Sequence, residues 1–352
     1  MGGLADVARS AGVSKATASR ALSGAGYVAP ATRRRVAEAA TALGYVPSTT
    51  AQGLATGRTR AVAVVMPYVD RWFFAGVLEG VQSALLERGL DLVLYTARPG
   101  TPARHRILAE LLARTRFDGL IAVGLDPDSG ERERMLTLGK PLVTVIGDGT
   151  ATAAVTLDDT DAGRRATTHL IGLGHRSIVF LGAGGHTHWP HVESARVLGY
   201  LEAMRAAGLG DRTRHARCEL TLPAGYAAAV DLLSEPGDRP TGIVAACDEV
   251  AIGAIVAARR LGIQVPSRLS VIGIDDHEYA EMFSLTTLHQ SPRDQGAQAV
   301  AMLVDRIEDP SLPPEEVRLK PRLVVRNSTA PADPAASAIL ADSGFFPRDD
   351  DR

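Results

Sequence analysis

The chain has 352 residues, 45% of them hydrophobic and 22% charged, and a formal net charge of −2. This length exceeds what one hydrophobic core organises, and the composition is that of a globular protein, so two or three domains are expected. No apolar signal segment opens the sequence and no apolar run reaches about 18 residues, which argues against secretion and membrane insertion and predicts a cytoplasmic protein. Two cysteines, Cys218 and Cys247, are too few for a disulfide framework and are not spaced for zinc.

Residues 4–22 predict a helix-turn-helix, the DNA-reading unit in which two short helices flank a tight turn. Apolar residues recur at helical spacing, Gly12 supplies the turn, and Ser14 is placed to cap the second helix. The outer face of that helix then carries donors and small side chains suited to phosphates and base edges: Lys15, Ala16, Thr17, Ser19 and Arg20. For this segment alone, an ordinary helical hairpin is the alternative.

A third helix is predicted to end before Pro47, because the residue preceding a proline disfavours helical geometry. Val36, Ala40 and Leu43 fall on its expected buried face.

Arginines crowd the first turn expected for this third helix, at Arg33, Arg34 and Arg35. Cations at a helix N-terminus oppose the macrodipole, so phosphate contact is one reason for them and a solvated face is the other. Residues 1–60 carry eight Lys and Arg and two acidic residues, a net charge of +6, so the remainder of the chain carries −8. This asymmetry predicts that the N-terminal part binds a polyanion.

From Arg60 onward, short apolar runs alternate with helical patterns. The runs with the length and branching of strands are residues 61–67, 90–96, 119–124, 141–147, 153–158, 177–182, 242–247 and 269–276. The segments with helical periodicity are residues 75–89, 104–115, 161–174, 195–208, 226–236, 249–262 and 293–309. Regular alternation predicts parallel sheets with helices on both faces.

Several motifs in one order resemble the LacI/GalR family of bacterial transcription regulators. The matching runs are residues 4–22, 32–47, 48–67, 157–182, 271–276 and 285–290. The resemblance implies a homodimeric transcription regulator, in most cases a repressor, that binds a pseudo-palindromic DNA operator and is controlled by a small-molecule effector.

The domain organisation implied by the resemblance has four parts. They are a helix-turn-helix domain at residues 1–47, a hinge helix and linker at 48–59, an effector-binding and dimerisation domain at 60–330, and a tail at 331–352. The third part resembles the periplasmic-binding-protein type I fold, with two parallel-sheet subdomains and chain crossovers near Asp159, Gln290 and Leu319. The tail contains proline and aspartate without a sustained heptad, so we expect it to be disordered and the assembly to be a dimer.

In what the resemblance implies for DNA, the second helix enters the major groove with Lys15, Ala16 and Arg20 at base-reading positions. Three hydroxyl-bearing residues would contact phosphates: Ser14, Thr17 and Ser19. The hinge would order only on the operator and insert Leu54 of each protomer into the central minor-groove step. Gly53 lies inside this hinge and costs about 1 kcal/mol of helix stability relative to alanine, so we expect the free hinge to be disordered.

The effector is expected in the cleft between the subdomains, since ligands of open α/β sheets bind beyond the carboxyl ends of strands. Asp275 ends one strand, Cys247 and Asp248 end another, and Arg196 matches the family's ligand-clamping arginine. A carboxylate that accepts two hydroxyls beside an arginine fork is a common way to hold a polyol.

Phe73 and Phe74 resemble the aromatic pair that packs on the effector from the other subdomain, with core packing as the alternative. Two positions depart from the sugar-binding pattern. Cys247 replaces an asparagine, and Ile146 replaces an aspartate, with Asp148 two residues later. A sugar is therefore the expected ligand, and a purine, a nucleoside or another polar metabolite stays open.

Residues 186–191 are the one segment that suggests metal chemistry, because His186, His188 and His191 have a spacing that could bind zinc. In the family this segment is an effector-binding loop, so His188 or Trp189 is expected to contact the effector, and no metal or other cofactor is expected. Nothing resembles a nucleophile elbow, a phosphate loop or a dinucleotide fingerprint, which argues against an enzyme. The alternatives are a metabolite-binding protein without DNA activity and a metal-dependent hydrolase that uses the His186 segment.

Overall fold

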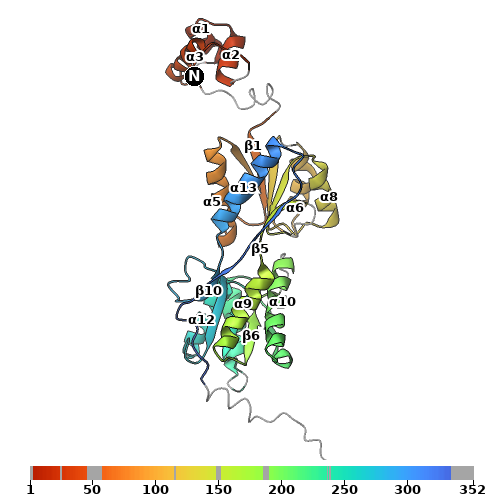
Figure 1. The fold of residues 1–352 in the computed structure, drawn as a ribbon, viewed down its shortest axis with the longest axis vertical. Helices are drawn as coiled ribbons and strands as arrows, with labels where there is room; N and C mark the ends of the chain where they lie inside the picture. Colours follow the sequence, from red (N-terminus) through yellow and green to blue (C-terminus); the bar gives the residue numbers. More distant parts are fainter. Residues whose placement is uncertain are drawn as a thin grey trace, which may run out of the picture.

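The computed structural model describes residues 3–23, 26–45, 58–114, 116–147, 152–184, 190–235, 237 and 239–333. A small helical domain is followed in the chain by two α/β subdomains, each built on a six-stranded sheet (Figure 1). Within the described residues, no helix has both the length and the apolar character needed to cross a bilayer.

The N-terminal domain consists of α1 (Leu4–Ser10), α2 (Lys15–Ser23) and α3 (Pro30–Ala42). Val7, Ala18 and Val36 are fully buried where the three helices meet. This domain is a compact three-helix unit with a small core of valine and alanine.

The third helix ends before Pro47, as predicted, but two other expectations for it are wrong. It ends at Ala42, and Leu43 is 36% exposed, while Val36, Ala39 and the predicted Ala40 form the buried face. The helix also starts earlier, at Pro30, and Arg33 is already far enough inside to bond the carbonyl of the capping Ala29. The macrodipole fades beyond the first turn, so it opposes the arginines that follow less than expected.

The first subdomain has a parallel sheet whose order is β11-β5-β4-β3-β1-β2. Its strands are β1 (Ala61–Met66), β2 (Asp91–Thr96), β3 (Gly119–Val123), β4 (Leu142–Val145), β5 (Ala153–Leu157) and β11 (Glu316–Leu319). One face packs on α5 (Trp72–Glu87) and α13 (Pro292–Glu308). The other packs on α6 (Pro102–Arg106), a π-helical turn (Ile107–Leu111), α7 (Leu112–Arg114) and α8 (Ser129–Thr137). Helices α5 and α13 approach so closely that a Cβ on Gly80 would lie 2.0 Å from the carbonyl oxygen of Arg293.

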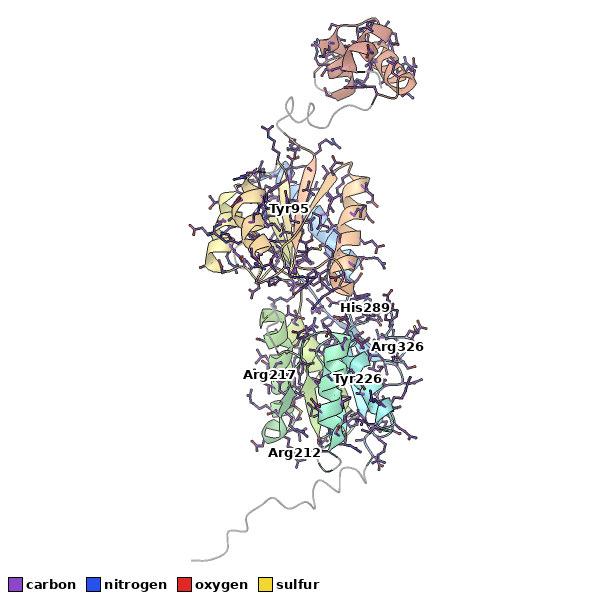
Figure 2. All side chains as sticks on the ribbon, turned by 180° about the vertical axis from the view of Figure 1, so that it is seen from behind. Tyr95, Arg212, Arg217, Tyr226, His289 and Arg326 are labelled. Atoms are coloured by element: carbon purple, nitrogen blue, oxygen red, sulfur yellow. The ribbon has the colours of Figure 1, made fainter. Side chains whose placement is uncertain are left out.

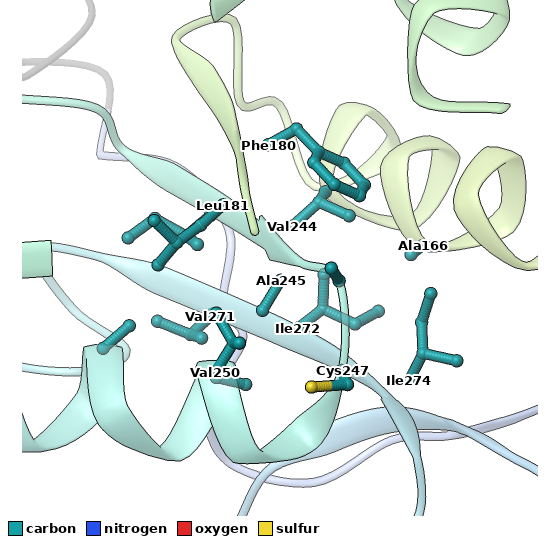
Figure 3. Close-up of a cluster of buried hydrophobic side chains, with 14 of the residues drawn as sticks. Ala166, Phe180, Leu181, Val244, Ala245, Cys247, Val250, Val271, Ile272 and Ile274 are labelled. Carbon is teal, nitrogen blue, oxygen red and sulfur yellow. The ribbon is translucent and has the colours of Figure 1, made fainter. Parts of the chain in front are cut away.

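The second subdomain has a sheet of order β12-β10-β9-β8-β6-β7, parallel except for β12. Its strands are β6 (Ile178–Leu181), β7 (Arg214–Ala216), β8 (Gly242–Ala245), β9 (Ser270–Asp275), β10 (Thr286–His289) and β12 (Arg322–Val324). Its helices are α9 (Asp159–Gly172), α10 (Pro190–Ala206), the short 3-10 turn Gly210–Arg212, α11 (Leu222–Ser234) and α12 (Asp248–Arg260). Phe180, Val244 and Ile272 lie on the face of the sheet that packs on Ala166 of α9, whereas Ala245 and Val271 lie on the opposite face, with Val250 of α12 (Figure 3).

The chain passes between the two subdomains three times. It leaves the first sheet after β5, returns after β10 to form α13, and leaves again between β11 and β12. The predicted fold, a helical DNA-binding domain followed by two parallel-sheet subdomains, is confirmed. Helix α8 and strands β7, β10, β11 and β12 were not predicted.

Candidate functional site

The outer face of α2, which is predicted to contact DNA, is exposed. Lys15, Ala16, Ser19 and Arg20 are exposed and Thr17 is half-buried. Ahead of the helix, the Oγ of Ser14 accepts a hydrogen bond of 3.1 Å from the Thr17 backbone N–H, which is the expected cap.

A shallow basic groove lies on the same domain, beside α3. Tyr27, Pro30, Arg33 and Arg34 line it, and Tyr27 is 89% exposed. Arg35 is exposed as well. Tyr27 was missed in the sequence, where a single aromatic residue in a loop carries no periodic signal. Exposed guanidinium groups beside an aromatic ring suit contact with a phosphate backbone.

Several predicted site residues lie outside the described residues. They are Leu54, Asp148, His186, His188 and Trp189, and the side chain of His191 is not described either.

Arg196, on α10, is buried at 5% exposure in the cleft between the subdomains. Its Nε donates to Asp159 Oδ1 at 2.7 Å and its Nη1 to the Ala246 carbonyl at 2.5 Å, and its Nη2 lies 3.8 Å from Asp275 Oδ1. Burial opposes ionisation of the guanidinium, but Asp159 and Asp275 outweigh it and raise the pKa of Arg196. Asp159, which the sequence marked only as a crossover, is therefore part of the site.

Asp275 stands at the end of β9 with a backbone φ of 133°, and it is 9% exposed. Gln290 Nε2 donates to its Oδ1 at 2.6 Å, and Gln295 Nε2 in turn donates to Gln290 Oε1 at 2.9 Å. Burial raises the pKa of Asp275 to about 6, although Arg196 and Gln290 act in the opposite direction. The carboxylate is thus held in one orientation, next to the arginine.

Asp248 does not face the cleft, contrary to expectation. It is fully buried and accepts hydrogen bonds from the His277 backbone N–H at 2.8 Å and from Thr287 Oγ1 at 2.6 Å. Burial and the charge of Asp275 raise its pKa to about 8. Asp248 therefore anchors the loop that follows β9.

Asp276, the next residue after Asp275, is bound on the second subdomain by two side chains. His289 Nδ1 lies 3.0 Å and Arg326 Nη2 2.8 Å from its carboxylate, and Figure 2 shows these two residues close together. Adjacent aspartates thus have different partners.

Aromatic side chains enter the cleft from the start of α5. Phe74 is only 3% exposed and packs edge-on against Phe73 and Tyr68, so much of its surface belongs to the core. Trp72 instead stacks on His277 of the other subdomain, with ring centroids 5.0 Å apart and planes at 31°. This contact across the cleft was missed, because nothing local in the sequence pairs residues 72 and 277.

A cavity of about 80 Å³ unites several of the predicted effector residues. Phe73, Phe74, Arg196, Cys247 and Asp275 all line it. Residues that were not predicted complete the lining, among them Arg71, Trp72, Glu249, His277 and Gln290. The cavity is thus lined by aromatic rings together with carboxylates and guanidinium groups.

Comparison with known proteins identifies the chain. Residues 3–48 match the family model described as bacterial regulatory proteins, lacI family, and residues 167–329 match a periplasmic binding protein-like domain. The transcriptional regulator CelR of Thermobifida fusca is 35% identical over 92% of this chain and 96% of its own length. The chain belongs to the lacI family. The HTH-type transcriptional repressor PurR of Vibrio vulnificus is 32% identical over 93% of this chain and 98% of its own length.

Solved structures agree with this lacI-family assignment. A lac repressor dimer bound to operator and the anti-inducer ONPF superposes with a TM-score of 0.83 at 25% identity, covering 94% of this chain and 99% of that one. A CelR–cellobiose complex gives a TM-score of 0.68 at 31% identity over 93% and 100% of the two chains. The predicted family and its fold are therefore confirmed, and the chain is a DNA-binding regulator of transcription.

The named relatives of this lacI-family chain are transcription regulators rather than enzymes. Among the described residues, no three His, Cys, Asp or Glu side chains gather so as to hold a metal ion. The His186 segment, on which the metal-dependent hydrolase alternative rests, lies outside the described residues.

Proposed function

We propose that this regulator is a cytoplasmic homodimeric repressor. Its affinity for the operator falls or rises when a neutral polyhydroxyl metabolite binds between the subdomains. The observation that carries the proposal is the charge balance around Arg196. Its guanidinium already has Asp159, the Ala246 carbonyl and Asp275 around it. An anionic ligand would find no unsatisfied arginine at this position and would meet the carboxylate of Asp275 instead.

A neutral sugar suits the same arrangement. Asp275 is fixed by Gln290 and has further acceptor capacity for hydroxyl groups, while Trp72 and Phe73 offer apolar ring faces in the same cavity. Asp148, His188 and Trp189 are proposed to complete the ligand contacts. Sugar-bound structures of relatives, with cellobiose and with ribose, support this class of ligand.

A neutral purine is the second candidate, because Trp72 and His277 present aromatic surfaces in the cavity. A flat base stacked on Trp72 would leave Asp275 to accept its N–H groups.

On the DNA side, Lys15, Ala16 and Arg20 are proposed to read bases in the major groove of each half-site. Contacts to phosphates are assigned to the remaining polar residues of the interface: Ser14, Thr17, Ser19, Arg33 and Arg34. Leu54 is proposed as the minor-groove wedge. A two-fold operator requires two copies of this domain, and the operator-bound lac repressor dimer supports that assembly.

The test begins with an operator selected from random duplexes and measures its affinity by fluorescence anisotropy with cellobiose, ribose, hypoxanthine or glucose 6-phosphate. We expect one neutral sugar to change operator affinity at least about fivefold and glucose 6-phosphate to change nothing. Asp275→Asn should lose the response, whereas Asp276→Asn, the matched change one residue further on, should retain it. A response to hypoxanthine alone would favour the purine, and a response to glucose 6-phosphate alone would refute both.

A further inference from the structure

Two helices of the first subdomain, α5 and α13, begin at the cleft. Trp72 and Phe73, in the first turn of α5, line the cavity around Arg196. Gln290 lines the same cavity, and Gln295, in the first turn of α13, donates to Gln290 Oε1 at 2.9 Å. The N-terminal ends of both helices therefore adjoin the candidate ligand site.

Helices α5 and α13 lie side by side and pack as one unit (Figure 1). A Cβ on Gly296 would lie 2.2 Å from the carbonyl oxygen of Val77, and one on Gly76 would lie 3.0 Å from Pro292 Cβ. Backbones in such close contact leave no room for one helix to move without the other. Because α5 has 16 residues and α13 has 17, each helix spans about 25 Å from the cleft toward the opposite end of the sheet.

The segment that leads into β1 binds the far ends of both helices. Arg58 Nη2 donates to the carbonyl oxygen of Ile307, in the last turn of α13, at 3.2 Å. Arg60 Nη2 donates to the carbonyl oxygen of Gly89, just beyond α5, at 2.9 Å and to that of Arg88 at 3.4 Å. Carbonyl groups at a helix C-terminus have no partner within the helix and carry the negative end of the macrodipole, so guanidinium groups suit this position.

Asp118, directly before β3, fixes the backbone of the same segment. Its Oδ1 accepts hydrogen bonds from the Thr59 N–H at 2.8 Å and from Thr59 Oγ1 at 3.0 Å, and its Oδ2 accepts one from the Arg60 N–H at 2.8 Å. Arg60 has a backbone φ of 57°, which a residue other than glycine keeps only where surrounding contacts hold it. A displacement of the ends of α5 and α13 is therefore passed directly to this segment.

We propose that Arg58 and Arg60 are positioning residues through which α5 and α13 transmit the state of the cleft to the DNA-binding domain. When the cleft ends of the helices are displaced, the C-terminal carbonyl groups carry the two guanidinium groups with them. The start of the chain that leads to the predicted hinge then moves as well. This inference rests on the proposed control of operator binding by the cleft and names the residues that carry it.

The experiment is a pair of double-mutant cycles on operator affinity, measured by fluorescence anisotropy on the full-length protein without any ligand. Trp72→Ala disturbs the cleft end of α5 and is combined with Arg60→Gln. Gln295→Leu disturbs the cleft end of α13 and is combined with Arg58→Gln. We expect each cleft substitution alone to change operator affinity at least threefold, and less than about 1.5-fold once the arginine at the far end of the same helix is replaced.

Arg88→Gln is the matched control, because it removes the same charge at the same end of α5. Its Nη1 donates to the Ala84 carbonyl of its own helix at 2.9 Å, and its own carbonyl, which Arg60 binds, is unchanged by the substitution. In this background Trp72→Ala should keep its full effect on operator affinity. The exposed Arg58 and Arg60 and the half-buried Trp72 are not core residues, so the α5 cycle decides the inference if Gln295→Leu fails to fold.

Salt dependence separates positioning from direct contact with DNA. Replacing an arginine that binds a phosphate reduces the slope of log affinity against log salt concentration by about one unit. We expect Arg58→Gln and Arg60→Gln to have the same slope as Arg88→Gln. A slope lower by about one unit than that of the control would assign phosphate contact to that arginine and refute its positioning role.

The outcomes also separate this inference from the proposed function. If the cleft substitutions act equally with and without the arginines, or do not change operator affinity at all, transmission through α5 and α13 is wrong, whatever the ligand is. Because no ligand enters these measurements, failure of every neutral sugar to bind would refute the proposed ligand class without deciding the cycles.

Discussion

Arg196 has a structural role that its sequence position does not reveal. Its side chain is 7% exposed and joins α10 to Asp159 at the first crossover and to the end of β8 at Ala246. Removing one partner of a buried ion pair leaves the other charge uncompensated, which costs about 3–5 kcal/mol. Loss of ligand binding in an Arg196 variant would therefore not by itself assign a ligand contact.

We expect Arg196→Ala to lower the free energy of unfolding by about 3–5 kcal/mol, measured by urea denaturation. Arg164→Ala is the matched control, because Arg164 pairs with Asp161 on the surface and is 52% exposed. Exposed pairs contribute about 0–1 kcal/mol. Equal losses in the two variants would contradict a buried, stabilising pair at Arg196.

The buried carboxylates near Arg196 predict a pH dependence of stability. Burial raises the pKa of Asp248 to about 8 and that of Asp275 to about 6, whereas an unfolded aspartate ionises near pH 3.9. Between about pH 4 and 8 the folded protein thus retains protons that the unfolded chain has released, so the contribution of these groups to stability decreases as the pH rises.

Asp248→Asn should reduce this decrease by up to about 1.4 kcal/mol per pH unit, measured by urea denaturation between pH 4.5 and 7.5. Asp211→Asn, on the exposed 3-10 turn, should leave the slope of stability against pH unchanged. A wild-type slope retained in Asp248→Asn would show that this carboxylate does not hold its proton in the folded state.

At the scale of helices and strands, apolar sequence runs predicted most elements, and the elements without such a run were missed, including β10 (TTLH), which is buried. Strands such as β3 and β6 are buried along their whole length and therefore appear as continuous apolar runs. Edge strand β11 has the sequence EVRL with alternating exposure, α8 is largely polar, and β12 has only three residues, so no apolar pattern marks them.

The same distinction applies to the candidate site. Asp275 and Cys247 were predictable because they end apolar strands, where ligands of α/β sheets bind. Asp159 and Trp72 acquire their roles through contacts with Arg196 and His277, which are distant in sequence. Asp248 was misplaced because a strand end alone does not determine which way the next side chain points.

We propose that α2 carries the sequence preference of the regulator and that α3 mainly adds affinity. Arg20→Ala should lose about 1–3 kcal/mol of discrimination between operator and random duplex. Arg34→Ala should weaken binding to both duplexes alike. It should also reduce the slope of log affinity against log salt concentration by about one unit. Titrations at two salt concentrations measure both effects, and equal losses on the two duplexes for Arg20→Ala would refute base reading by Arg20.

At the scale of the whole molecule, the three crossovers and the Trp72–His277 stack connect the two subdomains around the cleft. A ligand held between them shifts the equilibrium between two arrangements of the subdomains. The size of this shift in free energy equals the difference between the ligand's binding free energies for the two arrangements. We propose that such a shift reaches DNA through the predicted hinge, which includes Gly53. Because short helices are marginal in water, we expect this hinge to need its dimer mate and the operator to become helical.

Gly53→Ala tests this coupling, because alanine favours a helix by about 1 kcal/mol over glycine. We expect operator affinity without ligand to rise up to about fivefold, and the ligand to change that affinity by a smaller factor, since part of the ordering cost no longer depends on subdomain position. Gly172→Ala, at the end of α9 with no atom within 4 Å of the added Cβ, is the control and should alter neither quantity. Anisotropy titrations with and without the sugar measure both, and a Gly53→Ala protein with wild-type affinity and response would place the coupling outside the hinge.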